Sequence, residues 1–237
     1  MEAAGWIGEA VGVQFPDWKV RLKGFDLEVG CIVIDQNMVA GISLFAHDYS
    51  SGLPAEVRTN LSFSSRASTL RPSTAYVLLT IADLQPGETI LDFVCGIGTI
   101  PIHAKFMNPM CFSLGAEIDS DAVRQAAENA RSTSVEVVQW DSRRIPLRDG
   151  CIDVIVADMP FGIRCGSHRS NARLYPMVLR ETSRILRCGG RAVFLVMAKK
   201  LFLGSIASRR ALEIQKSFDT VVGGLPVAIY VVQKCRE

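Results

Sequence analysis

The spacing of two glycines gives the first sign of ligand chemistry in this chain. Residues 92–99 read Asp-Phe-Val-Cys-Gly-Ile-Gly-Thr and follow an apolar run, so a strand is expected to give way to a helix here. Gly96 and Gly98 let the backbone turn sharply and approach a ligand closely. The N–H groups at the start of the helix suit an anionic group such as a carboxylate. The residues predicted to line this site are Asp92, Cys95, Gly96, Gly98 and Thr99.

Spacing excludes two common nucleotide-binding loops. A dinucleotide fingerprint needs a third glycine where this chain has Pro101, and the glycine-lysine phosphate loop is absent from the sequence. Acidic residues end the next two apolar runs instead. We expect Glu117 to accept hydrogen bonds from ribose hydroxyls and Asp141 to accept one from an adenine amino group. Together the three strand ends predict S-adenosylmethionine as cofactor; the alternative is that they only cap helices and form solvated turns.

A second constellation suits the recognition of a planar amine. Residues 158–162 (Asp-Met-Pro-Phe-Gly) follow the apolar run 152–157, so Asp158 is expected in the ligand crevice of an open α/β sheet. The lone pair of an exocyclic amine is delocalised into its ring. Asp158 and the Pro160 carbonyl would accept the two amine hydrogens and direct the lone pair at a methyl donor. Phe161 would stack on a flipped base. The alternative is a proline turn with a capping aspartate.

Nucleic-acid binding has to come from local patches, because the net charge is only +2. Arg164 and Arg169 follow the amine motif directly and are predicted to contact phosphates beside the target base. Arg66 and Arg71 lie in a segment without acidic residues from 57 to 82. Contact of these two arginines with RNA and simple solubility of a linker stay open as alternatives.

Alternating apolar runs predict the elements that position these residues. From residue 89 onward, strands alternate with helices, as in a mostly parallel sheet covered on both faces. The strands are predicted at 89–94, 111–117, 135–140, 152–157, 191–197 and 227–233, and the helices at 99–106, 121–131, 174–186 and 200–209. Cys188, Gly189 and Gly190 are interpreted as the cap of the third of these helices.

The N-terminal part has a different organisation. Short strands are predicted between about residues 18 and 45, within a first segment of 1–47. Residues 48–70 are polar and are interpreted as a linker. A buried helix at 72–82, with Pro72 in its first turn, opens the domain predicted at 71–237.

Composition limits the compartment and the metal chemistry. Seven cysteines form no C-x-x-C pair and the three histidines have no second ligand nearby, so neither disulfides nor a metal site are expected. No signal peptide is predicted and no apolar run approaches the ~18 residues needed to span a bilayer. We therefore expect a chain without a membrane partner, located in the cytoplasm or the nucleus.

These motifs resemble the THUMP-domain-containing RNA guanine-N2 methyltransferases over about residues 18–237. The similarity is carried by residues 70–76 (Leu-Arg-Pro-Ser-Thr-Ala-Tyr), 92–99, 158–162, 174–176 with 179–181, and 223–225. The resemblance is stronger to the branch acting on the tRNA acceptor stem than to the branch acting on a small nuclear RNA. It implies a Rossmann-like class I methyltransferase fold with a mostly parallel seven-stranded sheet. It also implies a partial THUMP-like segment at 1–47 and N2-methylation of guanosine in RNA, with tRNA expected.

The resemblance further implies a small zinc-binding activator subunit shared among several methyltransferases. The chain departs from the family at Phe93, where proline is usual, at His103, where glutamate is usual, and at Ile163, where lysine is usual. Two other functions stay open. One is methylation of another planar amine, such as a small nuclear RNA guanine, DNA adenine or protein glutamine. The other is a catalytically impaired remnant that only binds RNA or a partner.

Overall fold

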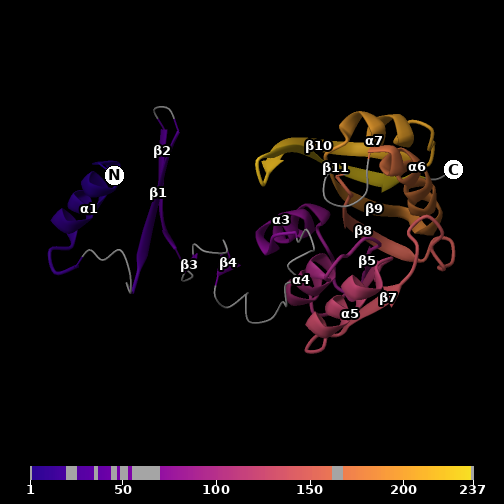
Figure 1. The fold of residues 1–237 in the computed structure, drawn as a ribbon, viewed down its shortest axis with the longest axis horizontal. Coiled ribbons are helices and arrows are strands. Elements are labelled where there is room, and N and C mark those ends of the chain that lie inside the picture. Colours follow the sequence, from indigo (N-terminus) through magenta and orange to yellow (C-terminus); the bar gives the residue numbers. More distant parts are fainter. Residues whose placement is uncertain are drawn as a thin grey trace. The chain divides into compact units, whose positions relative to one another are not determined.

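The chain was analysed as a computed structural model that describes residues 2–19, 26–34, 37–43, 47–48, 53–54, 70–161 and 168–235. It divides into two compact units, Met1–Thr59 and Asn60–Glu237 (Figure 1). Each unit is described by itself.

The first unit begins with a helix that the sequence did not predict. Helix α1 (Glu2–Gln14) contains three glycines, which lower helix propensity and hide the pattern. Strands β1 (Glu28–Ile34) and β2 (Asn37–Ser43) pair antiparallel, which confirms strands in this region. A short antiparallel pair follows, β3 (His47–Asp48) with β4 (Leu53–Pro54). The assignment of 1–47 as THUMP-like and 48–70 as a linker stays a prediction.

The second unit is an α/β domain around one seven-stranded sheet, as predicted. The sheet order is β10-β11-β9-β8-β5-β6-β7; β5 to β9 pair in parallel, and β11 pairs antiparallel with both of its neighbours, β9 and β10. The strands are β5 (Thr89–Asp92), β6 (Phe112–Glu117), β7 (Val135–Gln139), β8 (Ile152–Asp158), β9 (Leu186–Val196), β10 (Leu212–Val222) and β11 (Leu225–Lys234). The helices are α3 (Pro72–Ala82), α4 (Thr99–Met107), α5 (Ser120–Asn129), α6 (His168–Ile185) and α7 (Lys199–Ile206).

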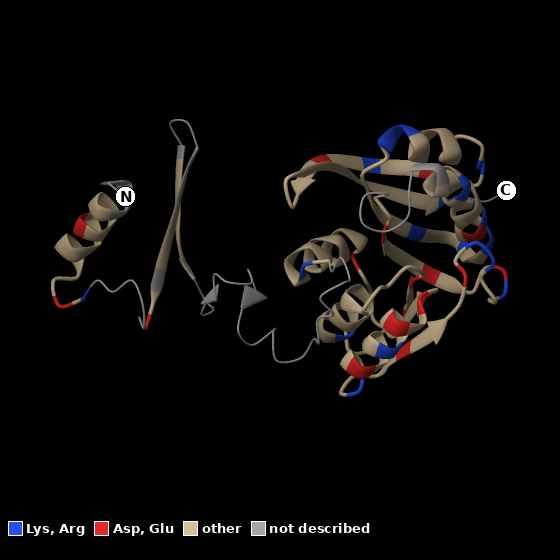
Figure 2. Cartoon of the chain, in the orientation of Figure 1, with Lys and Arg blue, Asp and Glu red and all other residues tan. Residues whose placement is uncertain are grey.

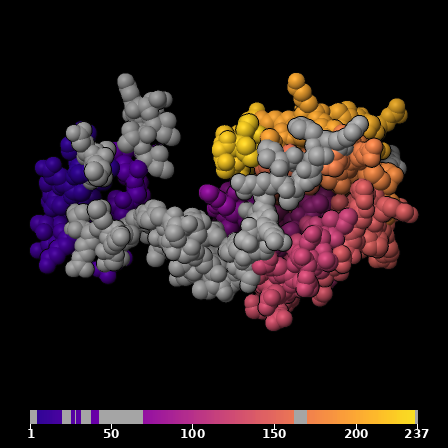
Figure 3. All heavy atoms as spheres, viewed as in Figure 1, coloured from indigo at the N-terminus to yellow at the C-terminus, as the bar shows by residue number. Residues whose placement is uncertain are grey.

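Helices cover both faces of this sheet. Successive residues of β8 point to opposite faces: Ile155 packs in the core under α6 and α7, whereas Val154 and Val156 pack in the core under α3 and α4. Helix α5 packs beside β6 and β7 at the other end of the sheet. In Figure 3 the surface of α3 (purple) lies beside that of the β10–β11 hairpin (yellow), in agreement with the shared core of α3 and β11.

Chain order reverses between the central strands β5 and β8. The chain leaves β5 toward β6 on one side, and β8 returns to pair with β5 on the other. In an open α/β sheet, ligands bind beyond the carboxyl ends of strands at such a reversal. Asp92 ends β5 and Asp158 ends β8, so the fold places both predicted site residues at this point.

Two elements differ from expectation at the antiparallel end of the sheet. Strand β9 begins directly after α6, so residues 188–190 lie inside the strand and do not cap the helix. Gly189 has φ +76°, and this left-handed residue permits the irregular start of the strand. Strand β10 was missed because it is an exposed edge strand with a register shift between Ile214 and Lys216, which breaks its apolar alternation.

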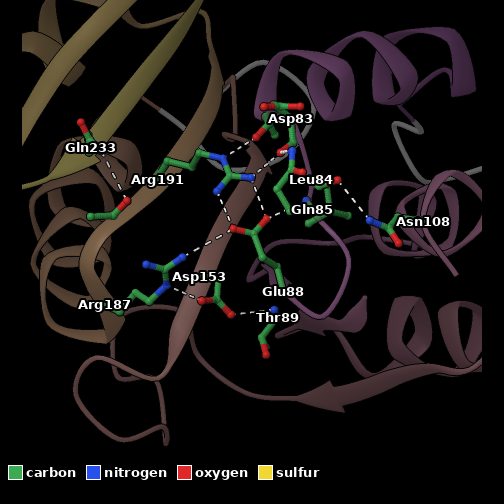
Figure 4. A network of polar contacts seen from close by, with 12 residues as sticks. Asp83, Leu84, Gln85, Glu88, Thr89, Asn108, Asp153, Arg187, Arg191 and Gln233 are labelled. Carbon is green, nitrogen blue, oxygen red and sulfur yellow. Dashed lines mark hydrogen bonds and ion pairs between the residues drawn. The ribbon is translucent and has the colours of Figure 1, made fainter. Parts of the chain in front are cut away.

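A polar network fastens β9 to the segment before β5 (Figure 4). Arg191 of β9 makes two hydrogen bonds of 2.7 Å to the Glu88 carboxylate and also donates to the carbonyls of Ala82 and Asp83. Burial would raise the pKa of Glu88, but hydrogen bonds from Arg191 and from the Gln85 amide hold it below its usual value. The pairing therefore stabilises the fold above the unfolded pKa of about 4.5 and is lost as pH falls below it.

We expect Arg191→Ala to lower the free energy of unfolding by roughly 2–3 kcal/mol at pH 7, measured by urea denaturation. Breaking a fully buried ion pair costs about 3–5 kcal/mol, and the effect is smaller here because the Arg191 side chain is 21% exposed. Arg187→Ala is the matched control. Its side chain is 46% exposed, pairs with Asp153 and lies 3.6 Å from the Glu88 carboxylate without hydrogen-bonding to it, so about 0–1 kcal/mol is expected. Equal effects of the two substitutions would contradict the role given to Arg191.

Candidate active site

The glycine loop (residues 93–98) makes a tight turn directly after the carboxyl end of β5. Gly96 and Gly98 have φ of +54° and +89°, a region that favours glycine. The Gly98 amide donates to the Cys95 carbonyl at 2.9 Å, and the Cys95 amide donates to the Ala116 carbonyl of β6 at 2.9 Å. A Cβ at Gly98 would lie 3.2 Å from the Ile102 side chain. The local conformation is the one that the sequence predicted, with Thr99 as the first residue of α4.

Two residues that sequence reasoning missed support this loop. A Cβ at Gly115 of β6 would lie 3.0 Å from both Cys95 Sγ and the Pro101 ring, so only glycine lets the loop pack on β6. The side chain of Asn129, buried at the end of α5, donates to the Ile97 carbonyl at 3.0 Å. Asn129 follows Ala126 by three residues on the buried helix face. A polar residue at that apolar position was a signal that could have identified it.

Glu117 connects the glycine loop to the end of β6. One carboxylate oxygen, Oε2, accepts from the Gly96 amide at 3.1 Å. The other oxygen, Oε1, accepts from the amides of Ile118 at 2.7 Å and Asp119 at 3.2 Å. The half-buried carboxylate is thereby fixed beside the loop, where Asp119 caps the next helix. The structure brings Glu117 and the loop together.

Asp92 is a buried carboxyl at the end of β5. Its Oδ1 accepts from the Val94 amide at 3.0 Å. Burial raises the pKa of Asp92 well above its usual value, and the nearby charges of Asp158 and Glu117 raise it further. The carboxyls that end β6 and β8 are therefore near enough to Asp92, at the end of β5, for their charges to act on it. Burial together with the negative charges of Asp92 and Glu117 raises the pKa of the Cys95 thiol, which disfavours a nucleophilic thiolate.

Asp158 ends β8 with an unpaired acceptor. Its Oδ1 is buried and has no hydrogen-bond partner among the residues that the structure describes. Burial raises the pKa of this carboxyl to about 7. A buried polar atom without a partner is costly, so its presence at the end of a central strand indicates a functional site.

The segment after Asp158 is held from α6. The Pro160 carbonyl accepts from Asn171 Nδ2 at 2.6 Å and from the Tyr175 hydroxyl at 3.1 Å. The sequence did not predict these two contacts. Phe161 is partly buried against the core under α3. The expected roles of Pro160 and Phe161 toward a substrate stay predictions.

Asp141 lies beyond β7 and pairs with a neighbour. Its two carboxylate oxygens accept from the Arg143 guanidinium at 2.6–2.9 Å, and Oδ1 also accepts from the Arg143 amide. The hydrogen bonds from Arg143 lower the pKa of Asp141. An adenine amino group would have to share this carboxylate with Arg143.

The departures from the family pattern have structural roles. Phe93 is buried and packs near Phe194, with ring centroids 6.3 Å apart. His103 is half-buried, and its Nδ1 lies 2.8 Å from the Thr99 carbonyl oxygen. Burial lowers the pKa of His103. The neutral ring is thereby bound within its own helix.

The predicted RNA-binding arginines fall mostly outside the described structure. Arg66, Arg164 and Ile163 lie outside the described residues, and Arg169 lies in α6 with its side chain outside the description. Arg71 is exposed immediately before α3. Figure 2 shows charged positions of both signs distributed over the second unit.

Among the residues that the structure describes, no group of three or more His, Cys, Asp or Glu side chains could hold a metal ion. No helix in the described part of the chain is long and apolar enough to cross a membrane.

Comparison with known proteins matches residues 62–227 to the family described as RMKL-like, methyltransferase domain. Among curated proteins, the chain is 36% identical to the bovine (Bos taurus) tRNA (guanine(6)-N(2))-methyltransferase THUMP3, over 100% of this chain and 48% of the relative. It is 29% identical to the bovine U6 snRNA (guanine-N(2))-methyltransferase THUMPD2, over 80% of this chain and 36% of the relative. The chain thus spans about half the length, or less, of these relatives.

A solved structure supports the fold independently. TrmN from Thermus thermophilus superposes with a TM-score of 0.74 at 24% identity, covering 96% of this chain and 65% of that chain. The similarity extends over nearly the whole of this chain and confirms the predicted methyltransferase architecture of the second unit.

Proposed function

Because this chain belongs to the family of RMKL-like methyltransferase domains, we propose that it transfers a methyl group from S-adenosylmethionine to the exocyclic N2 amine of a guanosine in RNA, with tRNA as the expected substrate. The observation that carries this proposal is the buried Asp158 oxygen at the carboxyl end of β8, which has no hydrogen-bond partner among the residues that the structure describes. Asp158 is near enough to Asp92 for its charge to raise the pKa of Asp92, and so is Glu117, which accepts from the glycine loop.

The acidic cluster fits the proposed cofactor. S-adenosylmethionine carries a sulfonium and an ammonium charge, and the carboxyls of Asp92 and Glu117 beside the glycine loop would provide the opposite charge. Glu117 would accept from the ribose hydroxyls and Asp141, shared with Arg143, from the adenine amino group. Gly96, Gly98 and Thr99 would bring backbone N–H groups to the methionine carboxylate, with Asp92 and Cys95 lining the loop. When bound, the cofactor supplies an electrophilic methyl group.

Asp158 supplies the chemistry that the chain itself contributes. Its ionised carboxylate accepts a hydrogen of the guanine amine, which fixes the orientation of the lone pair and stabilises positive charge that develops on nitrogen. The same carboxylate would receive the proton that the methylated amine loses. Phe161 holds the base by stacking.

RNA as substrate class is supported by two groups of relatives, which are named as guanine-N2 methyltransferases of tRNA and of U6 snRNA. The proposal includes phosphate contacts by Arg66, Arg71, Arg164 and Arg169 and a partial THUMP-like segment at 1–47. It also includes a small zinc-binding activator subunit, supported by the exposed Met110 and Phe112 at the amino edge of the sheet. A location in the cytoplasm or nucleus agrees with the six described cysteines, all of which are free.

We expect Glu117→Ala to weaken S-adenosylmethionine binding by roughly 1–3 kcal/mol in calorimetry, because buried ribose hydroxyls lose a charged acceptor. The matched control is Glu117→Gln, which keeps one carbonyl acceptor and the side-chain shape. It should lose less affinity than Glu117→Ala. A dissociation constant unchanged by Glu117→Ala would remove Glu117 from the ribose role.

The proposed function is tested by methyl transfer from labelled cofactor to four separate acceptors: total tRNA, small nuclear RNA, DNA and protein. Each reaction is run with and without the activator subunit. Incorporation into tRNA supports the proposal. Incorporation into DNA or protein alone would favour another planar amine. Cofactor binding without transfer to any acceptor would favour a catalytically impaired remnant.

A further inference from the structure

Two side chains of α6 donate hydrogen bonds to the carbonyl oxygen of Pro160. Asn171 Nδ2 donates at 2.6 Å and the Tyr175 hydroxyl donates at 3.1 Å. The two residues are four positions apart and therefore lie on one face of the helix. Asn171 is 1% exposed and Tyr175 is fully buried, so both hydrogen bonds form away from water. A carbonyl oxygen has two lone pairs, and these donors engage both.

The backbone beside this carbonyl is fixed to β9 as well. The Met159 amide donates to the Leu195 carbonyl at 2.9 Å, and the Met159 side chain is buried. Asp158 lies in register with Leu195 on the paired strand. The segment is therefore held on one side by β9 and on the other by α6. Asp158 Oδ1, in contrast, has no partner among the described residues.

The Tyr175 hydroxyl is suited to remain a donor. Burial raises its pKa, and the neighbouring negative charge of Asp158 raises it further, so the hydroxyl keeps its proton at neutral pH. The ring packs edge-on against Phe202, with centroids 6.5 Å apart, which fixes the hydroxyl in place. The influence of the Asp158 charge also indicates that the Tyr175 hydroxyl lies near the proposed amine acceptor.

We infer that Asn171 and Tyr175 are positioning residues that hold the Pro160 carbonyl and, through it, the backbone that carries the Asp158 carboxylate toward the substrate amine. The inference rests on the proposed function and replaces the role that the sequence predicted for the Pro160 carbonyl. Helix α6 thereby sets the position of Asp158 through the backbone two residues away. Such positioning matters because a displacement of about 1 Å in an active site costs on the order of 10²-fold in rate.

The test uses single-turnover methyl transfer to tRNA with saturating cofactor and RNA. Tyr175→Phe and Asn171→Ala should each lower the rate constant about tenfold, because each variant keeps one of the two hydrogen bonds to the Pro160 carbonyl. Cofactor and RNA dissociation constants should stay within about twofold of wild type, since neither residue is placed in a binding site. The double variant should lose at least the product of the single losses, because no side-chain donor then remains on the Pro160 oxygen.

The matched control is Tyr230→Phe, which removes a hydroxyl from the same aromatic cluster. Tyr230 is 6% exposed and stacks on Phe202 with centroids 4.7 Å apart. Its rate constant should equal that of wild type. If Tyr175→Phe also keeps the wild-type rate, the positioning role of Asn171 and Tyr175 is wrong. A higher rate would contradict it as well, since it would mean that the freed Pro160 carbonyl accepts the amine better. A loss explained entirely by weaker cofactor binding or unfolding would equally overturn it. A wild-type chain that methylates no RNA overturns the proposed function and this inference with it.

Discussion

Asp158→Ala is expected to lower the single-turnover methylation rate by ~10²-fold or more, the scale of removing one positioned electrostatic group from a catalytic site. The reason is that the Asp158 oxygen contacts the amine as charge develops on it. Loss of this oxygen raises the barrier and leaves the bound ground state nearly unchanged. The affinities for RNA and for S-adenosylmethionine should therefore stay close to wild type. The measurement is rapid-quench transfer of a labelled methyl group, with binding measured separately by calorimetry.

The matched control is Asp153→Ala on the same strand. Asp153 lies toward the opposite end of β8, where it pairs with Arg187 and accepts from the Thr89 amide at 2.8 Å. Its loss should reduce stability and leave the single-turnover rate of the folded protein near wild type. If Asp158→Ala retained its rate on an RNA that wild type methylates, the assignment of residues 158–162 as the catalytic centre would be wrong.

The pH dependence of the reaction is the second large effect. Burial raises the pKa of Asp158 from its ordinary 3.8 to about 7, and only the ionised form accepts the amine hydrogen. Activity should therefore fall as pH is lowered through 7. The ionised fraction drops from about nine-tenths at pH 8 to about one-hundredth at pH 5. We expect kcat/KM for the cofactor, which reports groups in the enzyme before cofactor binds, to fall by roughly 90-fold over that interval.

The titration of Asp92 has to be distinguished from that of Asp158 in the pH profile. The pKa of Asp92 is also raised by burial, and the two carboxyls influence each other. Asp92→Asn removes its titration, and the acidic limb that remains belongs to Asp158. Circular dichroism over pH 5–8 checks that the fold persists, since the Glu88 pairing is lost only below about pH 4.5. A flat profile, or activity that rises as pH falls, would contradict an ionised Asp158 as acceptor.

The raised pKa of Asp158 affects activity and stability in opposite directions: activity is expected to rise with pH, whereas the free energy of unfolding is expected to fall. A carboxyl whose pKa is raised by folding binds its proton more tightly in the native state, so its contribution to stability declines as pH rises toward 7. The substitution Asp158→Asn removes the buried charge and keeps the shape of the side chain. It is therefore expected to stabilise the fold at pH 8 while it reduces catalysis.

The sequence predicted the parts of this site that depend on position along a strand. Asp92, Glu117 and Asp158 each end an apolar run, and parallel strands bring such ends to one edge of the sheet. The parallel pairing of the central strands and the glycine loop follow from the same local patterns, whereas the edge strand β10 was missed. The structure confirms that Glu117 meets the loop at Gly96.

Contacts that depend on how a helix is rotated about its own axis could not be predicted from the sequence. Asn171 and Tyr175 reach Pro160 only because α6 presents one particular face to β8 and β9, across a segment of 11 or 15 residues. The pairing of Arg191 with Glu88 spans 103 residues and depends on the docking of α3 against β9. The local pairing of Asp141 with Arg143, two residues apart, is the kind of contact that spacing alone could have suggested.

In the proposed reaction, the Asp158 segment directs a methyl group to guanine N2. This role is tested most directly by mass spectrometry of nucleosides from tRNA methylated in parallel by the wild-type chain and by Asp158→Asn, each supplied with the activator subunit. We predict N2-methylguanosine as the product of the wild-type chain and at most about one-hundredth of that rate with the variant. A different methylated nucleoside, or equal product from both proteins, would contradict the account.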